Sequence, residues 1–271
     1  MDARLQRRVQ RYGWDRAAPA YEDFWAEQIR PAQMRLLEVI DLQPGERVVD
    51  VACGTGLMSI PMATLVGPRG AVVGTDLSEG MLASARELAA RLGLANADFE
   101  RMDAEALDLA DASFDVALCA LGLMYVPDPA ASLREMRRVL EPGGRAAALV
   151  WGQRAKCGWA EIFPIVDARV KTEVCPLFFR LGTGDVLARA FEAAGFGDVR
   201  TDRFEKLLTW ATDAEACGAA FDAGPVALAW SRFDELARAE ARAEYLASIR
   251  PHRNGSGYRV PGEFVIVTGR A

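Results

Sequence analysis

VVDVACGTG, residues 48–56, is an apolar strand pattern that ends on an acidic residue and runs directly into a glycine-rich turn. Gly54 and Gly56 carry no side chain, so the backbone can bend sharply there and approach a ligand closely. The free N–H groups at the start of the following helix would face that ligand. The stretch therefore predicts a strand, a turn and a helix that together bind a cofactor.

Apolar strands alternate with amphipathic helices on both sides of this turn, which is typical of a parallel sheet covered on both faces. The expected strands are residues 47–51, 71–76, 97–101, 114–120, 145–150, 199–210 and 263–268. The expected helices are residues 78–92, capped by Ser78, then 128–140, 185–194, a stretch opened by the capping-box pair Thr212 and Glu215, and 231–250. The sequence thus predicts an α/β fold with a doubly wound, mostly parallel, seven-stranded sheet and a helical cap over its C-terminal strand edge.

Interruptions of the alternating pattern divide the chain into core and cap segments. We expect a helical lid over residues 1–40, a cofactor-binding core over 41–151, a cap insertion over 152–184, a continuation of the core over 185–210, a helical cap insertion over 211–257 and a final core strand over 258–271. The arginines near the start, Arg4, Arg7, Arg8 and Arg11, are interpreted as a solvated helix face. The aromatic residues of the insertions are expected to form mainly the core of the cap.

Composition excludes several classes of protein. The chain has 271 residues, 51% of them hydrophobic and 26% charged, which is ordinary globular composition and not that of a disordered or collagenous chain. Its net charge of −6 disfavours nucleic acid as a partner. Five cysteines without a CxxC pair predict reduced, buried thiols. We expect a cytoplasmic protein with no metal site and no stable membrane insertion.

An acidic residue at the end of the second strand adds to the cofactor prediction. Asp76 follows Gly56 by twenty residues, where a carboxylate could accept hydrogen bonds from two ribose hydroxyls. A dinucleotide fingerprint needs a third Gly or Ala, but Ser59 stands at that position. Asp50 would oppose a pyrophosphate and would suit an ammonium group. A nicotinamide-dependent oxidoreductase nevertheless remains an alternative.

Four motifs in order resemble those of class I S-adenosylmethionine-dependent methyltransferases over residues 46–150. VVDVACGTG resembles the first motif, with Ala52 where a glycine is usual, and VVGTDLSEGM resembles the second. RMDAEAL, residues 101–107, resembles the adenine-binding motif. SFDVALCALGLMYVPDP and LREMRRVLEPGGR resemble the fourth strand, its helix and the next turn. Within the family, the chain is similar to the ubiquinone and menaquinone C-methyltransferases and their small-molecule relatives, which implies the Rossmann-like methyltransferase fold.

The resemblance implies S-adenosyl-L-methionine as cofactor and assigns residues to it. Asp50 would orient the methionine ammonium, Asp76 would bind the ribose hydroxyls and Asp103 would accept from the adenine amine. The other implied cofactor residues are Ala52, Cys53, Gly54 and Gly56 in the turn, Leu77, Met81 and Ala104 around the adenine, and Cys119, Ala120 and Leu121 beside the methionine arm.

Three residues are candidates for catalysis. Tyr21 resembles a lid tyrosine of these enzymes, and Tyr125 could orient a nucleophile or pack as an aromatic. His252 is the only histidine, and its ordinary pKa suits proton removal near neutral pH. It lies in the segment PHRNGSG, so an exposed loop histidine is the alternative interpretation.

The sequence therefore predicts methyl transfer from S-adenosylmethionine to a C, O, N or S atom of a small acceptor by direct in-line displacement. The aromatic insertions favour an apolar or aromatic acceptor. A non-catalytic S-adenosylmethionine-binding module is a second alternative, and a homodimer stays open.

Overall fold

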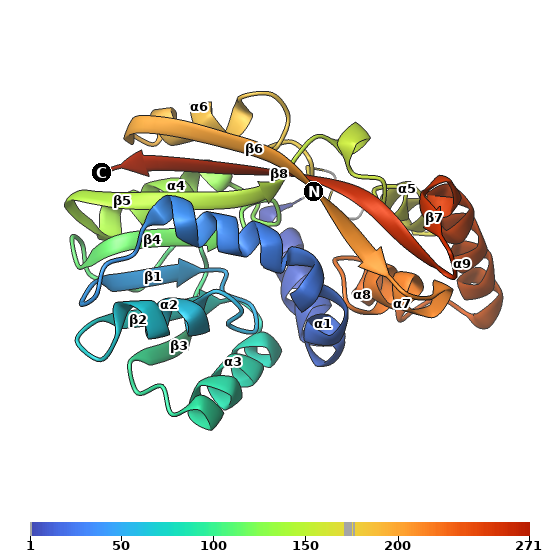
Figure 1. Cartoon of the computed structure of the whole chain (residues 1–271), viewed down its shortest axis with the longest axis horizontal. Helices are drawn as coiled ribbons and strands as arrows, with labels where there is room; N and C mark the ends of the chain where they lie inside the picture. Colours follow the sequence, from blue (N-terminus) through green and yellow to red (C-terminus); the bar gives the residue numbers. More distant parts are fainter. Residues whose placement is uncertain (1, 171–174, 176) are drawn as a thin grey trace.

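A mixed β-sheet forms the centre of the molecule (Figure 1). The computed structural model describes residues 2–170, 175 and 177–271. Seven strands follow the order β3-β2-β1-β4-β5-β8-β6, and the short β7 pairs with β8 off this path. Their bounds are β1 Arg47–Val51, β2 Ala71–Asp76, β3 Ala97–Arg101, β4 Phe114–Ala120, β5 Leu140–Trp151, β6 Gly197–Trp210, β7 Arg253–Asn254 and β8 Gly257–Arg270. Strands β1 to β5 pair in parallel, whereas β8 is antiparallel to β5 and β6, which confirms the predicted fold class.

The central strand β1 sets the position of the cofactor turn. Val48 and Val49 are fully buried because β1 is flanked by β2 on one side and β4 on the other. Strand order reverses here, since β2 and β3 lie to one side and β4 and β5 to the other, and ligands bind at such switch points in open α/β sheets. Asp50 pairs in register with Gly74, so the carboxyl ends of β1 and β2 meet at one edge.

Five helices pack around the sheet: α1 Ala3–Ile40, α2 Ser59–Val66, α3 Glu79–Leu92, α4 Pro129–Val139 and α6 Val186–Ala193. Figure 1 shows α1 crossing in front of the sheet and α4 behind it. The predicted caps are confirmed: the Ser78 hydroxyl accepts from the Met81 N–H, and the Asp128 carboxylate accepts from the first turn of α4. Gly93 ends α3 with a left-handed φ of 69°.

Long extensions of β6 and β8 carry a group of helices at one end of the molecule (Figure 1). These are α7 Asp213–Cys217, η2 Gly218–Asp222, α8 Ala227–Trp230 and α9 Glu235–Ile249, followed by η3 Arg250–His252. The first insertion contributes η1 Arg154–Lys156 and α5 Ile162–Asp167. Helix α1 packs against both α3 and α8, and the Trp25 indole donates to the Ala219 carbonyl at 3.1 Å. Helix α1 therefore contacts both the core and this helical group.

Several helices and strands begin at residues other than those predicted. Strand β5 begins at Leu140, five residues early, because Leu140 pairs with Phe114 ahead of an irregularity in the register. Strand β8 begins at Gly257 because its first residues pair with the far end of β6. Helix α9 begins later than predicted, after Asp234, whose carboxylate accepts from the Ala237 N–H. Residues 171–174 and 176 of the predicted first cap insertion lie outside the described residues.

Aromatic side chains of α1, β5, β6 and the segment after β5 pack against one another. The ring of Trp25 meets those of Trp151, Trp159 and Trp210 edge-on at centroid distances of 6.1, 6.0 and 6.4 Å. All four rings are buried, so their edge-on contacts stabilise the attachment of α1. All five cysteines are free thiols, and four of them are buried. Within the part of the chain that the structure describes, no helix is long and apolar enough to cross a membrane.

Candidate active site

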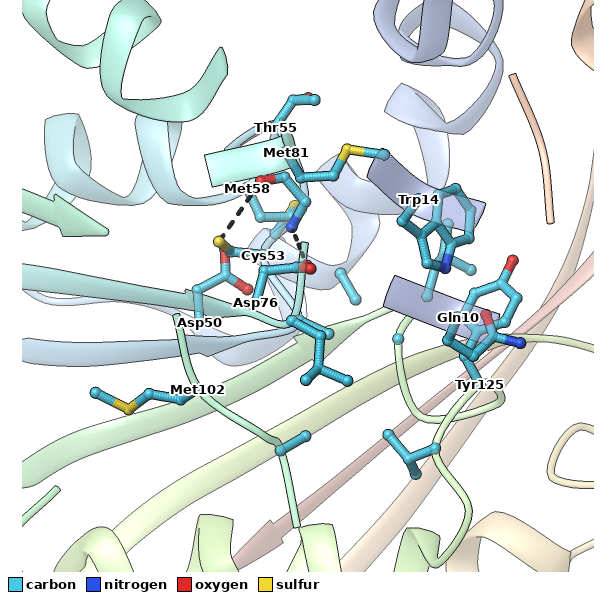
Figure 2. Close-up of a pocket in the computed structure, with 18 of the residues that line it drawn as sticks. Gln10, Trp14, Asp50, Cys53, Thr55, Met58, Asp76, Met81, Met102 and Tyr125 are labelled. Carbon is cyan, nitrogen blue, oxygen red and sulfur yellow. Dashed lines mark hydrogen bonds between the residues drawn. The ribbon is translucent and has the colours of Figure 1, made fainter. Parts of the chain in front are cut away.

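A pocket lies at the carboxyl ends of β1, β2, β3 and β4, beneath α1 (Figure 2), and its volume is about 930 Å³ when the space open to solvent is included. Every predicted cofactor residue except Gly56 and Cys119 lines it: Asp50, Ala52, Cys53, Gly54, Asp76, Leu77, Met81, Asp103, Ala104, Ala120 and Leu121. Tyr21 and Tyr125 line it as well. Four separate strand ends thus contribute to one cavity.

Asp50 lies at the end of β1 with an unsatisfied carboxylate oxygen. Its Oδ2 accepts a hydrogen bond from the Ser59 hydroxyl at 2.6 Å, while its Oδ1 is buried without a partner. Burial raises the pKa of Asp50 to about 7; the Ser59 hydrogen bond opposes this rise and the nearby charge of Asp76 adds to it. A buried acceptor without a donor destabilises the free protein, so this oxygen is suited to a cationic donor.

Asp76 connects the glycine turn to the start of α3. Its Oδ2 accepts from the Gly54 N–H at 2.9 Å, and its Oδ1 accepts from the Ser78 N–H at 2.8 Å. Burial raises the pKa of Asp76, and the two backbone hydrogen bonds oppose that rise. Each carboxylate oxygen keeps a second acceptor position, so the oriented group could bind a pair of hydroxyls.

Gly56 and Cys119 support the pocket without lining it. Gly56 has a left-handed φ of 84°, and a Cβ placed on it would lie 3.2 Å from the Cβ of Ala85 in α3. Its missing side chain therefore permits close packing of turn against helix. The side chain of Cys119 is fully buried in β4 below the pocket. Neither residue is among those that line the pocket, so the predicted roles of Gly56 in giving the cofactor room and of Cys119 beside the methionine arm stay predictions.

Arg7 occupies a position that the sequence did not predict. Its Nε lies 2.7 Å from Asp103 Oδ2, and its guanidinium also forms an ion pair with Glu105. The Arg7 side chain is only 33% exposed and lines the pocket, so the prediction that it belongs to a solvated helix face is wrong. Arg7 lies in the pocket because α1 packs across the carboxyl ends of the strands. Arg7 also balances part of the charge on the carboxylates beside it.

Helix α1 forms one wall of the pocket through residues on a common face. Gln10, Trp14 and Tyr21 recur at helical spacing, and Gln33 extends the same wall. The Trp14 ring meets the Tyr21 ring edge-on at a centroid distance of 5.7 Å and the Tyr125 ring at 5.0 Å. Figure 2 shows Gln10, Trp14 and Tyr125 on one side of the pocket and Asp50 and Asp76 on the other.

Asp15 holds this wall against the core. Its Oδ1 accepts from the Ser78 hydroxyl at 2.7 Å and from the Gly80 N–H at 3.1 Å. Ser78 also donates its own N–H to Asp76, so Ser78 links α1 to the Asp76 carboxylate through hydrogen bonds. Sequence reasoning missed Asp15, Gln10, Trp14 and Gln33, although their helical spacing offered a usable signal.

Comparison with known proteins identifies the domain that carries this pocket. Residues 42–153 match the family described as methyltransferase domain. A demethylmenaquinone methyltransferase from Bacillus cytotoxicus is 38% identical over 47% of this chain and 54% of its own length. The chain carries an S-adenosylmethionine-dependent methyltransferase domain. The similarity to the demethylmenaquinone methyltransferase spans only about half of that relative's length.

Other relatives extend over nearly the whole chain. Nocamycin O-methyltransferase from Saccharothrix syringae is 29% identical over 95% of this chain and 96% of its own length. Two solved structures share the methyltransferase fold. A Haemonchus contortus phosphoethanolamine N-methyltransferase 2 in complex with S-adenosyl-L-methionine has a TM-score of 0.61 and 17% identity over 93% of this chain and 57% of its own. The [4+2]-cyclase SpnF has a TM-score of 0.58 and 22% identity over 89% and 79%.

An S-adenosylmethionine-dependent methyltransferase domain implies this cofactor, and the pocket contains polar atoms that fit it. Asp50 Oδ1 and Thr55 Oγ1 are both buried without a hydrogen-bond partner, and both residues line the pocket. The methionine part of the cofactor carries an ammonium group, which could donate to Asp50 Oδ1, and a carboxylate, which could accept from the Thr55 hydroxyl. Among residues 2–170, 175 and 177–271, no group of three or more His, Cys, Asp or Glu side chains could hold a metal ion.

His252 lies apart from this pocket. It belongs to η3 after α9, within the helical group at the far end of β8, and it is absent from the residues that line the pocket. A Cβ on Gly158 would come within 2.7 Å of His252 Nε2, so the imidazole packs against that glycine. The prediction that His252 takes part in catalysis is not supported by this position, because η3 lies among the helices at the end of β8 and not at the carboxyl ends of β1 to β4.

Ala52 and Gly122 form a mutually dependent pair at the bottom of the pocket. Ala52 adopts a left-handed φ of 57°, and a Cβ on Gly122 would lie 2.5 Å from the Ala52 Cβ. We expect Gly122→Ala to destabilise the protein by about 1 to 3 kcal/mol because neither methyl can move aside. Ala52→Gly alone should be neutral or stabilising, since glycine tolerates this φ.

Urea unfolding of the single and double variants measures the coupling of this pair. The double variant Ala52→Gly, Gly122→Ala should recover part of the stability lost in Gly122→Ala. The recovery should be incomplete, because the new Cβ would also lie 2.9 Å from Cys119 Sγ. Equal losses in the single Gly122→Ala variant and in the double variant would show that the two methyl groups do not collide.

Proposed function

We propose that the protein transfers the methyl group of S-adenosylmethionine to a small acceptor by direct in-line displacement. The observation that carries this proposal is the unpartnered, buried Asp50 Oδ1 in the same pocket as the oriented Asp76 carboxylate. When bound there, S-adenosylmethionine supplies an electrophilic methyl group on a positively charged sulfur. The carboxylates bind the two ends of the cofactor, and the space between α1 and β4 receives the acceptor.

Each end of the cofactor has its own binding residues in this proposal. Asp50 accepts from the methionine ammonium and Thr55 donates to the methionine carboxylate. Asp76 accepts from the ribose hydroxyls, and Asp103 accepts from the adenine amine while it stays close to Arg7. Leu77, Met81 and Ala104 pack around the adenine, and Cys53, Gly54, Ala120 and Leu121 adjoin the methionine arm. Gly56 and Cys119 act from behind the pocket.

Positioning supplies most of the rate acceleration that this site can offer. Helix α1 acts as the proposed lid, covering the strand ends and orienting the acceptor, and the inserted segments form the proposed cap. Holding two reactants in line can lower a barrier by about 7 to 11 kcal/mol in favourable cases. The aromatic wall of Trp14, Tyr21 and Tyr125 favours an apolar or aromatic acceptor. The names of the relatives, for nocamycin and demethylmenaquinone, also support a small-molecule acceptor.

Isothermal titration with S-adenosylmethionine, S-adenosylhomocysteine and NAD tests the proposed cofactor site. We expect the first two to bind with one site per chain and NAD to show no binding at the same concentrations. Preference for NAD would instead support an oxidoreductase. Transfer of a labelled methyl group to an acceptor then separates an enzyme from a binding module. This second step is needed because the fold alone does not decide the reaction: a structure named as a cyclase shares it.

A further inference from the structure

Strand β6 forms one edge of the central sheet, because it pairs with β8 on one side only (Figure 1). Its backbone groups point alternately toward β8 and away from it. At Thr209 they point away, since the Gln28 side chain donates to the Thr209 carbonyl and accepts from its N–H, both at 2.7 Å. The Pro261 carbonyl, opposite Leu207, accepts from the Gly158 N–H and so points away from β6. The odd-numbered residues of β6 up to Thr209 therefore turn their backbone groups outward.

The middle of this edge is unpaired. Thr201, Arg203, Glu205 and Leu207 follow the same alternation, and no hydrogen bond from elsewhere in the described part of the chain reaches their outward N–H and carbonyl groups. We name residues 201–207 the free edge. It contains no proline, and the Leu207 side chain is 47% exposed. An exposed and unpaired strand edge can bind another strand.

The free edge has the sequence TDRFEKL, whose charges are complementary to those of the same sequence in reverse. If two copies pair antiparallel around Phe204, Lys206 of each copy lies opposite Asp202 of the other. Arg203 and Glu205 oppose each other in the same way. The hydrogen-bonded pairs then join odd-numbered residues only, as the backbone directions require. The two Phe204 side chains meet in a non-hydrogen-bonded pair, where cross-strand side chains come closest.

Neighbouring registers that keep these backbone directions oppose like charges. A two-fold centre at Asp202 or at Glu205 would place two carboxylates opposite each other, and a centre at Arg203 would do the same for two guanidinium groups. Lys206 is exposed and forms no ion pair within the described part of the chain. Asp202 Oδ2 accepts from Arg35 Nε at 2.7 Å, which leaves Oδ1 for an ammonium group of a second copy. Charge therefore favours the register centred on Phe204.

We propose that the free edge of β6 pairs with the same edge of a second copy of this chain, which forms an antiparallel homodimer with a two-fold axis at Phe204. The central sheet then continues from one copy into the other. Because the contact is symmetric, it gives a closed dimer and not a fibre. No residue of β6 lines the candidate active site, so the dimer leaves both pockets free and the inference does not depend on the proposed function.

Charge variants of the free edge test this pairing. Lys206→Asp places two carboxylates opposite each other at both ends of the paired stretch, and Asp202→Lys places two ammonium groups there. Sedimentation velocity from about 5 to 300 µM should show a wild-type dimer with a dissociation constant of about 10 to 100 µM, because the contact is short. Each variant alone should associate at least about tenfold more weakly.

A mixture of the two charge variants is the decisive sample. In a heterodimer of Lys206→Asp with Asp202→Lys, opposite charges face each other at both ends again. The mixture should therefore associate about as tightly as the wild type. Restored association also shows that both variants are folded, and it separates a contact between copies from the loss of the Arg35 ion pair within one copy.

Single cysteines locate the two-fold axis. Phe204→Cys should form a disulfide between copies under mild oxidation, since Cα atoms of a non-hydrogen-bonded pair lie about 4.5 Å apart, which a disulfide can span. Leu207→Cys is the matched control on the same edge. It lies opposite Thr201 of the second copy, so the two introduced thiols are about 20 Å apart and should not cross-link. The wild type, whose five cysteines are free, gives the background.

A wild-type chain that stays monomeric up to about 300 µM would overturn the inference. It would also be overturned if both charge variants associated like the wild type, or if their mixture associated no better than each variant alone. Cross-linking of Leu207→Cys as readily as Phe204→Cys would exclude a two-fold axis at Phe204 and so contradict the proposed dimer.

Discussion

Asp76→Asn is expected to weaken S-adenosylmethionine binding by about 100-fold or more, measured by isothermal titration. The carboxylate accepts from two backbone N–H groups and, in the proposed complex, from two ribose hydroxyls. A hydrogen bond to a charged group contributes about 1.5 to 3 kcal/mol, so weakening two of them produces a loss of this size. The asparagine keeps the shape of the side chain but offers only one acceptor atom to the Gly54 and Ser78 N–H groups. Thermal unfolding of the free variant therefore measures the part of the loss that comes from this turn and not from the ribose.

Asp98→Asn provides the matched control for Asp76→Asn. Asp98 lies exposed on β3, the strand next to β2, and outside the pocket. Its variant should bind the cofactor like the wild type. Asp76→Ala should in addition lower thermal stability, since the Gly54 and Ser78 N–H groups lose their acceptor. Wild-type affinity in Asp76→Asn would refute the assignment of the ribose site.

Asp50→Asn should abolish cofactor binding and also remove a pH dependence of stability in the free protein. The variant keeps an oxygen for Ser59 but cannot offer a negative charge to an ammonium group. Many functional carboxylates likewise destabilise the free protein and gain a hydrogen-bond or ion-pair partner only when the ligand binds. Asp50 resembles them in this respect.

The sign of the pH effect follows from the raised pKa of Asp50. Burial lifts it from 3.8 to about 7 in the folded protein, so folding favours the protonated form. This stability is present below pH 4 and is lost as the pH rises to 7. Between pH 5 and pH 8 the loss amounts to about 2 to 3 kcal/mol, an order-of-magnitude value. The groups near Asp50 are the Ser59 hydroxyl, the Asp76 carboxylate and the thiols of Cys53 and Cys119.

Urea unfolding at pH 5 and pH 8 compares the wild type with Asp50→Asn. The wild type should lose more stability than the variant over this interval, and the difference between the two losses isolates Asp50 from other titrating groups. Saturating S-adenosylmethionine should reduce the difference, because the ammonium stabilises the charged carboxylate. Parallel losses in the two free proteins would show that Asp50 is ionised throughout this interval.

The core of the fold could be predicted because its signals are local. The strand bounds of β1 to β4 match the predicted ones, and Ser78 and Asp128 cap the helices that they were expected to cap. Parallel strands bring their carboxyl ends to one edge of the sheet, so the sequence alone predicts that Asp50 and Asp76 lie close together.

Positions set by long-range packing escaped prediction. The local sequence does not distinguish Arg7 from the other arginines of α1. Only Arg7 among them lines the pocket, because the path of α1 across the sheet turns that side of the helix toward the strand ends. The imidazole of His252 is a residue type that often accepts protons in enzymes. Its position away from the pocket depends on the extended β8 and on η3, which no local sequence pattern reveals. The start of β5 at Leu140 likewise depends on its neighbour β4. The residue types predicted which side chains could bind a cofactor or transfer a proton. Tertiary contacts determine which of those side chains lie in the pocket.

A crystal structure with S-adenosylhomocysteine tests the cofactor site most directly. The ligand should place its ammonium within hydrogen-bond distance of Asp50 Oδ1 and both ribose hydroxyls at the Asp76 carboxylate, with its sulfur facing the α1 wall of the pocket. A ligand bound outside this pocket, or an ammonium and ribose that contact neither carboxylate, would contradict the assignment.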